Sequence, residues 1–110
     1  MNIQIFGRNK CFDTKKAQRW FKERRIKFQY IDVDRYGMSR GELNSVRSAV
    51  GLEAMINKSD RDYPTIQYLA ADAAKLDKLF DEPWLLATPI VRNGKQATVC
   101  YCHETWSVWE

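Results

Sequence analysis

The sequence contains few residues that bind metals or form disulfide bonds. Its three cysteines, Cys11, Cys100 and Cys102, are an odd number, which excludes a framework in which every cysteine is paired within the chain. We therefore expect free thiols in a reducing compartment. A zinc site with four ligands would consume all three cysteines and the single histidine, His103, so we expect no metal site. One histidine also leaves little room for acid–base catalysis.

Long apolar segments are missing as well. No run approaches the roughly 18–20 apolar residues that are needed to cross a bilayer. The opening residues 1–5 lack the charged, apolar and small-residue regions of a signal peptide. These absences predict a cytoplasmic protein that makes no contact with a membrane.

The composition fits one globular domain that spans residues 1–110. Hydrophobic residues make up 45% of the chain and charged residues 29%, a balance that argues against disorder. The formal net charge is +4, and the basic residues are densest between Lys15 and Lys27. No nucleic-acid-binding module accompanies them. We therefore interpret them as the solvated face of an amphipathic helix and expect no direct contact with nucleic acid.

The first third of the chain has the pattern of a strand, a helix and a second strand. A short apolar run over residues 3–7 predicts a buried strand. A helix is expected from Asp13 or Thr14, both good N-cap residues, to about Arg25. A second strand is expected over residues 28–33, ending at Asp34. Short connections between these elements favour a parallel, right-handed βαβ unit. The buried stripe of the helix is expected to consist of Ala17, Trp20 and Phe21.

The middle of the chain, from residue 39 to about residue 86, is expected to form small helices without strands. Ser39 and Glu42 have the spacing of a capping box, and Gly51 is expected to end the helix that follows. Further short helices are expected over residues 52–57, from Pro64 through Ile66 and Leu69, and along Leu76, Leu79 and Phe80 before Pro83.

The last part of the chain returns to strands. Residues 89–92 and 95–101 predict a hairpin, because Asn93 and Gly94 suit a tight turn with positive φ at both central residues. Residues 103–109 predict a closing helix with Trp106 and Trp109 on one side. A βαβ unit followed by a ββα unit is the thioredoxin-fold arrangement. We therefore predict an α/β, thioredoxin-like fold with a four-stranded mixed sheet and an all-helical insertion between its halves.

Cys11 lies between the first strand and the first helix. The free amides and the partial positive charge of a helix N-terminus stabilise a thiolate there. Arg8, Lys10 and Lys15 add positive charge nearby, and Asp13 opposes them. Such a setting lowers the pKa of a cysteine and makes it a nucleophile, whereas the alternative is a small apolar residue in a loop. We predict that Cys11 is reactive, with the helix terminus as the first cause and the cations as the second.

The other two cysteines and the strand-opening proline are harder to interpret. On a regular strand, Cys100 and Cys102 would share one face. Packing is then the expected role of Cys100, and Cys102 is a candidate to resolve an oxidised Cys11. The Thr88–Pro89 bond would be an ordinary trans bond on base rates alone. In the predicted fold, however, it lies against the Cys11 loop and is cis.

Several different short motifs are spread along essentially the whole chain. They are residues 3–7, Lys10-Cys11, Lys15-Lys16-Ala17, Tyr30-Ile31-Asp32, Ser39 with Glu42-Leu43, residues 52–57, Thr88-Pro89-Ile90-Val91 and Asn93-Gly94-Lys95. With these motifs the sequence resembles the family of thioredoxin-fold proteins that includes arsenate reductase (ArsC), Spx and YffB. Arsenate reductases of this family bind their oxyanion with arginines. At the corresponding positions this chain has Lys58 to Asp60, Thr88 and Tyr101. Lys58 and Arg92 are candidate substitutes, but lysine lacks the bidentate fork. Spx-type proteins place a second cysteine where this chain has Thr14.

The resemblance implies a thiol-dependent oxidoreductase in which Cys11 attacks an oxyanion or a disulfide. Glutathione, another small thiol or a glutaredoxin-type protein would resolve the adduct. The missing arginines predict weak or absent arsenate reduction. One alternative is a non-enzymatic regulator or adaptor, as Spx-like relatives bind RNA polymerase; another is an interaction module with an incidental cysteine. We expect a monomer without a bound cofactor. The candidate residues for binding substrate or thiol are Arg8, Lys10, Thr14, Lys15, Lys58, Thr88, Pro89 and Arg92.

Overall fold

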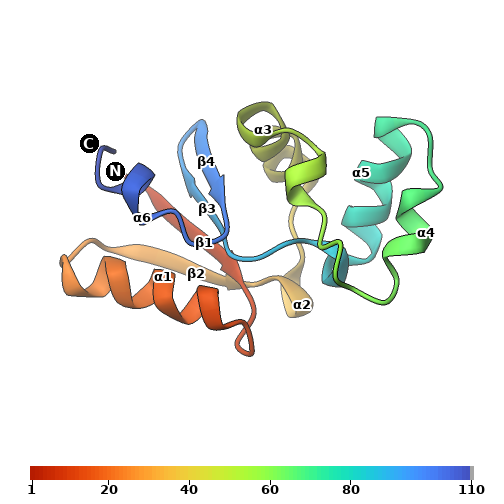
Figure 1. Ribbon diagram of the computed structural model, residues 1–110. Helices are drawn as coiled ribbons and strands as arrows, with labels where there is room; N and C mark the ends of the chain where they lie inside the picture. Colours follow the sequence, from red (N-terminus) through yellow and green to blue (C-terminus); the bar gives the residue numbers. More distant parts are fainter. Residues whose placement is uncertain (110) are drawn as a thin grey trace.

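A mixed four-stranded sheet forms the centre of the computed structural model, which describes residues 1–109. The strands β1 (Ile3–Gly7), β2 (Phe28–Asp32), β3 (Ile90–Asn93) and β4 (Gln96–Val99) lie in the order β2-β1-β3-β4. β1 is parallel to β2 and antiparallel to β3, and β3 is antiparallel to β4. This is the predicted thioredoxin-like sheet (Figure 1).

Helices cover both faces of the sheet and form the insertion. α1 (Phe12–Glu23) connects β1 to β2, and α6 (His103–Trp106) follows β4. The elements between β2 and β3 are α2 (Val33–Tyr36), α3 (Arg40–Val50), the 3-10 turn η1 (Glu53–Met55), α4 (Tyr63–Gln67), α5 (Asp72–Asp81) and the 3-10 turn η2 (Pro83–Leu85). Figure 1 shows α4 and α5 at the end of the molecule opposite to the two termini. Within residues 1–109, no helix is long and apolar enough to cross a membrane.

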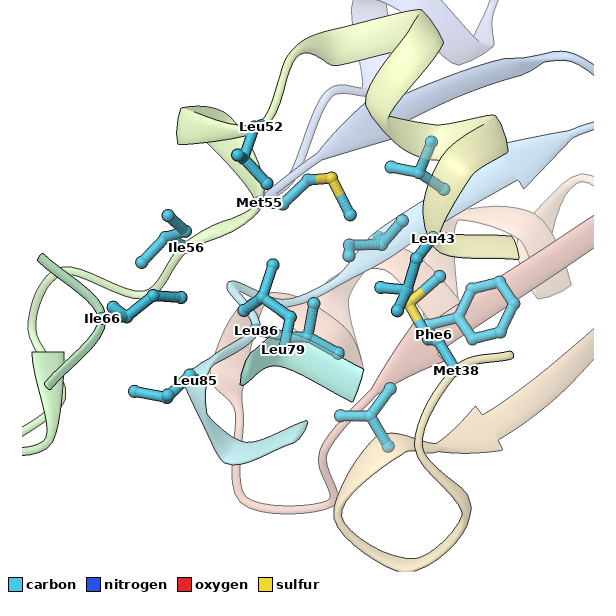
Figure 2. Packing of buried hydrophobic residues seen from close by; sticks show 13 residues of the cluster. Phe6, Met38, Leu43, Leu52, Met55, Ile56, Ile66, Leu79, Leu85 and Leu86 are labelled. Carbon is cyan, nitrogen blue, oxygen red and sulfur yellow. The ribbon is translucent and has the colours of Figure 1, made fainter. Parts of the chain in front are cut away.

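Successive side chains of β1 point to opposite faces and enter two separate cores. Ile3 and Ile5 pack against the predicted stripe of α1 and against α6, in an aromatic cluster completed by Ala17, Trp20, Phe21, Val91, Trp106 and Trp109. Phe6 enters the other cluster, which consists mainly of aliphatic side chains from the insertion, including those of α3. Figure 2 shows this second cluster extending from Phe6 and Met38 toward Ile66. The insertion is therefore anchored to the sheet by a continuous apolar core.

The predicted capping box starts α3. The Ser39 hydroxyl accepts the Glu42 amide at 3.1 Å, and the Glu42 carboxylate accepts the Ser39 amide at 2.9 Å. Gly51 ends the helix with a φ of +86°, a conformation that glycine adopts readily. The capping and stop signals read from the sequence are thus confirmed.

Three element boundaries before the insertion and within it differ from the prediction. β2 stops at Asp32 because its carboxylate accepts the Asp34 amide at 3.1 Å and caps α2, so Val33 begins a helix instead of ending a strand. Only residues 53–55 of the segment 52–57 are helical, as a 3-10 turn. α4 starts with Pro64 in its first turn as expected but ends before Leu69.

The C-terminal hairpin and helix are shorter than predicted. Asn93 pairs with Gln96, so the central turn residues are Gly94 and Lys95, and of these Gly94 has a positive φ of +61°. β4 ends at Val99 because Cys100 adopts a φ of +72°, which is incompatible with a strand. The helical segment after it ends at Trp106. Cys100 and Cys102 therefore do not share a strand face, contrary to the prediction.

Candidate active site

Cys11 lies at the carboxyl end of β1, where the chain turns into α1. Its amide donates to the Arg8 carbonyl at 3.0 Å and closes this turn. Its backbone is extended and its carbonyl accepts the Lys15 amide at 3.2 Å, so Cys11 is the N-cap of α1. The prediction that Asp13 or Thr14 caps the helix is therefore wrong.

Thr14 is unable to cap α1 because its side chain packs back against β1. It is fully buried, and a Cβ atom added to Gly7 would lie 2.3 Å from its Cγ2. Gly7 is thus required for this close approach, since any side chain there would displace Thr14. The Thr14 hydroxyl accepts the Arg8 amide at 3.4 Å, which fixes the hydroxyl beside the Cys11 turn.

The segment before β3 forms the other side of the site. The Thr88–Pro89 peptide bond is cis, as the fold predicted. The Cys11 thiol lies 3.7 Å from the Thr88 carbonyl oxygen and donates a weak hydrogen bond to it. The structure therefore places this segment against the Cys11 loop.

The pKa of the Cys11 thiol lies below its ordinary value. Burial alone would raise the pKa. Hydrogen bonds to the sulfur from the Thr14 and Thr88 hydroxyls, and then from the Thr14 and Asp13 amides, outweigh burial and lower it. The direction agrees with the prediction, but the causes differ. The hydroxyl groups contribute more than the helix amides, and the neighbouring cations, expected as the second cause, are not among the groups responsible.

Arg8 joins the Cys11 turn to α2 and to the segment before β3. Its Nε lies 2.9 and 3.1 Å from the two carboxylate oxygens of Asp34. Its terminal nitrogens donate to the carbonyls of Leu86 and Pro83 at 2.7 and 2.8 Å, and to the Thr88 hydroxyl at 3.2 Å. Only 16% of the side chain is exposed. The guanidinium is therefore engaged by protein acceptors.

Arg8 also orients both hydroxyls that face the sulfur. The Thr14 oxygen accepts the Arg8 amide, and the Thr88 oxygen accepts the Arg8 guanidinium. A hydroxyl has one hydrogen to donate, and accepting from Arg8 leaves that hydrogen free for Cys11. The two threonines are thereby set as donors to the thiolate.

The other predicted cations are distributed unevenly. Lys10 and Lys15 are exposed and flank Cys11, one in the turn and one in the first turns of α1. Lys58 pairs with Glu53 at 3.8 Å. Its ammonium thus contacts η1 and, within residues 1–109, makes no hydrogen bond or ion pair with Cys11, Arg8 or Thr88.

Arg92 also lies away from Cys11. It pairs with Gln4 across β1 and β3 and donates to the Gln4 side-chain oxygen at 2.9 Å. Gln4 is three residues before Gly7, roughly 10 Å along the strand. The two predicted substitutes for oxyanion-binding arginines are thus engaged by Glu53 and Gln4.

The two C-terminal cysteines have different surroundings. Cys100 is exposed, so the predicted packing role is wrong, and its amide donates to the Pro89 carbonyl at 2.8 Å. Cys102 is half-buried against the aromatic cluster, and its thiol donates to the Val99 carbonyl at 3.1 Å. Burial is the main cause that raises the pKa of both thiols.

Asp34 and Tyr30 belong to the site but were not predicted there. Asp34 holds Arg8, and the Tyr30 hydroxyl donates to the Asn9 side-chain oxygen at 2.8 Å. Burial, then the charges of Asp32 and Cys11, raise the pKa of Tyr30. One signal could have found Asp34: it follows the carboxyl end of β2, and the carboxyl ends of parallel strands meet at the same edge of a sheet.

The chain matches the ArsC family over residues 6–108. It belongs to the ArsC family. The global transcriptional regulator Spx 2 of Oceanobacillus iheyensis is 28% identical to this ArsC-family chain, over 94% of the chain and 79% of the relative. The solved structure of a protein named YFFB has a TM-score of 0.85 at 16% identity, with 96% of each chain covered. The arsenate reductase from Vibrio cholerae has a TM-score of 0.81 at 22% identity, with 90% of this chain and 89% of the other covered. The structural likenesses show the shared fold.

The site of this ArsC-family chain supplies a nucleophile and its donors. Cys11 provides the sulfur, Thr14 and Thr88 stabilise its anion, and Arg8 holds both threonines. Such an arrangement suits attack on a disulfide, because the thiolate is the form that reacts.

Proposed function

We propose that this ArsC-family protein is a thiol-dependent oxidoreductase with Cys11 as its nucleophile. The Cys11 thiolate attacks one sulfur of a disulfide such as glutathione disulfide. A Cys11–glutathione bond forms, the original disulfide bond breaks, and glutathione thiolate leaves. A second thiol then attacks this mixed disulfide and regenerates Cys11. The observation that carries the proposal is the stabilised Cys11 thiolate at the start of α1. The reaction suits the reducing cytoplasm.

Arsenate is proposed to be a poor substrate. Charge-assisted hydrogen bonds contribute roughly 1.5–3 kcal/mol each. Thr88 and Tyr101 stand where family arsenate reductases have arginines, and Lys58 pairs with Glu53. Losing two such donors weakens arsenate binding by about two to four orders of magnitude, at 1.4 kcal/mol per decade. Rapid glutathione-coupled reduction of arsenate by the unmodified protein would contradict this part of the proposal.

A second candidate function is transcriptional regulation through a protein partner. The 28% identity to the Spx 2 regulator favours it. In that case RNA polymerase is the partner to test, by co-purification of the reduced and oxidised protein with purified polymerase. Stable binding without turnover of any disulfide would favour the regulator over the enzyme.

The enzyme proposal is tested by the pH dependence of alkylation. With limiting iodoacetamide at about pH 7, Cys11 should be labelled before Cys100 and Cys102, since burial raises the pKa of the latter two thiols and the thiolate is the form that reacts. Cys11→Ser should lose the fast phase, and Cys102→Ser should retain it. Incubation with glutathione disulfide should then oxidise Cys11, either to a glutathione adduct or to a disulfide with another thiol of the chain, as measured by intact mass and peptide mapping. Equal labelling of the three thiols, or Cys11 that stays reduced, would reject the proposal.

A further inference from the structure

Cys100 approaches the same segment that Cys11 contacts. The Cys100 amide donates to the Pro89 carbonyl at 2.8 Å, and the Cys11 sulfur lies 3.7 Å from the carbonyl oxygen of Thr88. Thr88 and Pro89 are consecutive residues. The two cysteines therefore contact consecutive carbonyl groups of the same segment.

The chain after β4 also lies next to the start of α1. The Lys16 ammonium of α1 lies 4.3 Å from the centre of the Tyr101 ring. The charge of Asp13, in the first turn of α1, acts on the Cys100 thiol. Tyr101 and Cys100 are thus both adjacent to the helix that Cys11 caps.

Cys100 lies at the surface, in a segment that is not paired in the sheet. It is exposed, it lies outside β4, and its backbone has a φ of +72°. A non-glycine residue at positive φ is strained, so a rearrangement there releases strain. Tyr101 and Cys102, which follow it, pack against the aromatic cluster and limit the movement to a short segment.

The thiol of Cys102, the resolving residue expected from the sequence, makes its contacts with other groups than Cys11. Its thiol donates to the Val99 carbonyl at 3.1 Å, and its side chain packs against the cluster that contains Trp106. It also caps α6, so moving it would disturb the start of that helix.

We propose that Cys100 resolves the mixed disulfide formed on Cys11, an inference that rests on the proposed function. The Cys100 thiol loses its proton to solvent, and its sulfur attacks the Cys11 sulfur. A Cys11–Cys100 disulfide forms, the bond from Cys11 to the bound thiol breaks, and that thiol leaves as a thiolate that takes up a proton. Two equivalents of a small thiol then reduce the Cys11–Cys100 disulfide and leave as their own disulfide.

The charges around Cys100 favour this order of steps. Burial is the main cause that raises the pKa of Cys100, followed by the charges of Asp13, Cys102 and Cys11. Once Cys11 is in a disulfide it carries no charge, and its contribution disappears. Cys100 thus becomes a better nucleophile after the first step than before it.

The test uses the full chain and less than one equivalent of dithiobisnitrobenzoate, a disulfide that releases a coloured thiolate. Attack by Cys11 releases the first thiolate, and resolution releases the second. We expect two thiolates per reagent molecule from the unmodified protein and from Cys102→Ser, and one from Cys100→Ser, whose adduct on Cys11 should persist. Peptide mapping without reductant should recover Cys11 linked to Cys100 within one chain.

Two outcomes would overturn the inference. The first is the release of a single thiolate per reagent molecule from the unmodified protein. The second is the release of two thiolates from Cys100→Ser, with Cys11 linked to Cys102. A parallel reaction with glutathione disulfide separates this inference from the proposed function. If glutathione disulfide gives neither an adduct on Cys11 nor the Cys11–Cys100 link, while the aryl disulfide gives two thiolates and that link, the glutathione reaction is rejected and the resolving role of Cys100 is retained.

Discussion

Cysteines are the N-cap residues of two helices, α1 and α6, and the pKa values of these two thiols are shifted in opposite directions. Cys11 caps α1 and has a lowered pKa, whereas Cys102 caps α6 and has a raised pKa. Burial raises both. Two hydroxyls and two amides stabilise the Cys11 anion and outweigh burial, but the Thr98 hydroxyl alone does not outweigh it at Cys102. A helix start by itself therefore does not activate a thiol.

The two helix starts are also held in different ways. α1 has 12 residues, and its start is fixed by Thr14 packed on Gly7 and by Arg8. α6 has four residues, too few to be stable through its own hydrogen bonds. Its position depends on Trp106, which is 1% exposed and donates to the Thr98 hydroxyl at 2.7 Å.

The largest expected effect comes from Trp106→Ala. Removing this buried ring should lower the free energy of unfolding by about 3–5 kcal/mol, as large-to-small changes of core tryptophans do. Urea denaturation measures the loss. Because α1 is held by other contacts, the pH dependence of Cys11 alkylation in the folded variant should remain that of the unmodified protein. A shift in Cys11 reactivity would show that the two helix starts are coupled.

Arg8→Lys should have the next largest effect, because lysine keeps the charge and loses the fork. Unpaired carbonyls and a misplaced Thr88 hydroxyl should lower the free energy of unfolding by about 1–3 kcal/mol. The pKa of Cys11 should rise, since Thr88 is no longer oriented by Arg8. The matched control is Arg47→Lys, an exposed ion pair with Asp72, whose loss should cost less than about 1 kcal/mol. An unchanged alkylation profile in Arg8→Lys would refute the orienting role.

Replacing the threonine hydroxyl beside each cysteine tests how much that hydroxyl shifts the pKa of the thiol. Thr88→Val should raise the pKa of Cys11, and Thr98→Val should raise that of Cys102 further, because each threonine lowers the pKa of its own cysteine. Alkylation of Cys11 should therefore slow at about pH 7 in Thr88→Val and remain unchanged in strongly alkaline solution, where the thiol is fully ionised. Thr88→Ser, which retains the hydroxyl, is the control. Identical profiles for the valine and serine variants would show that the Thr88 hydroxyl does not lower the pKa of Cys11 and would leave the Thr14 hydroxyl and the helix amides as its causes.

Local signals in the sequence predicted most of the fold. The apolar stripe of α1, the Ser39–Glu42 capping box and Gly51 all act within one or two helical turns, so spacing alone reveals them. The order of elements then specified the sheet. The end of β4 was not predicted, because residues 95–101 have the composition of a strand. Nothing in that composition indicates the positive φ of Cys100.

The site was predicted in part. Its position between β1 and α1 follows from the order of elements, and the placement of Thr88 and Pro89 follows from the predicted fold. The partners of Arg8 do not, since Asp34 and Leu86 are distant in the sequence and meet only through the folded chain. For the same reason Lys58 and Arg92 were expected to bind substrate, although Lys58 is paired with Glu53 and the register of β3 places Arg92 beside Gln4.

The smallest expected effect is an opposite dependence of stability on pH at the two helix starts. The folded-state pKa of Cys11 is lowered, so its contribution to stability is complete above the unfolded-state pKa and is lost as the pH falls through the folded-state pKa. The folded-state pKa of Cys102 is raised, so its contribution is complete below the unfolded-state pKa and is lost as the pH rises through the folded-state pKa. From about pH 7 to about pH 10, the stability lost in Cys11→Ser should therefore grow, and that lost in Cys102→Ser should shrink. Each change should stay below about 1 kcal/mol, because water screens both partly exposed thiols. Urea denaturation in the presence of a reductant measures both series, and slopes of the same sign would contradict the opposite shifts on which the comparison rests.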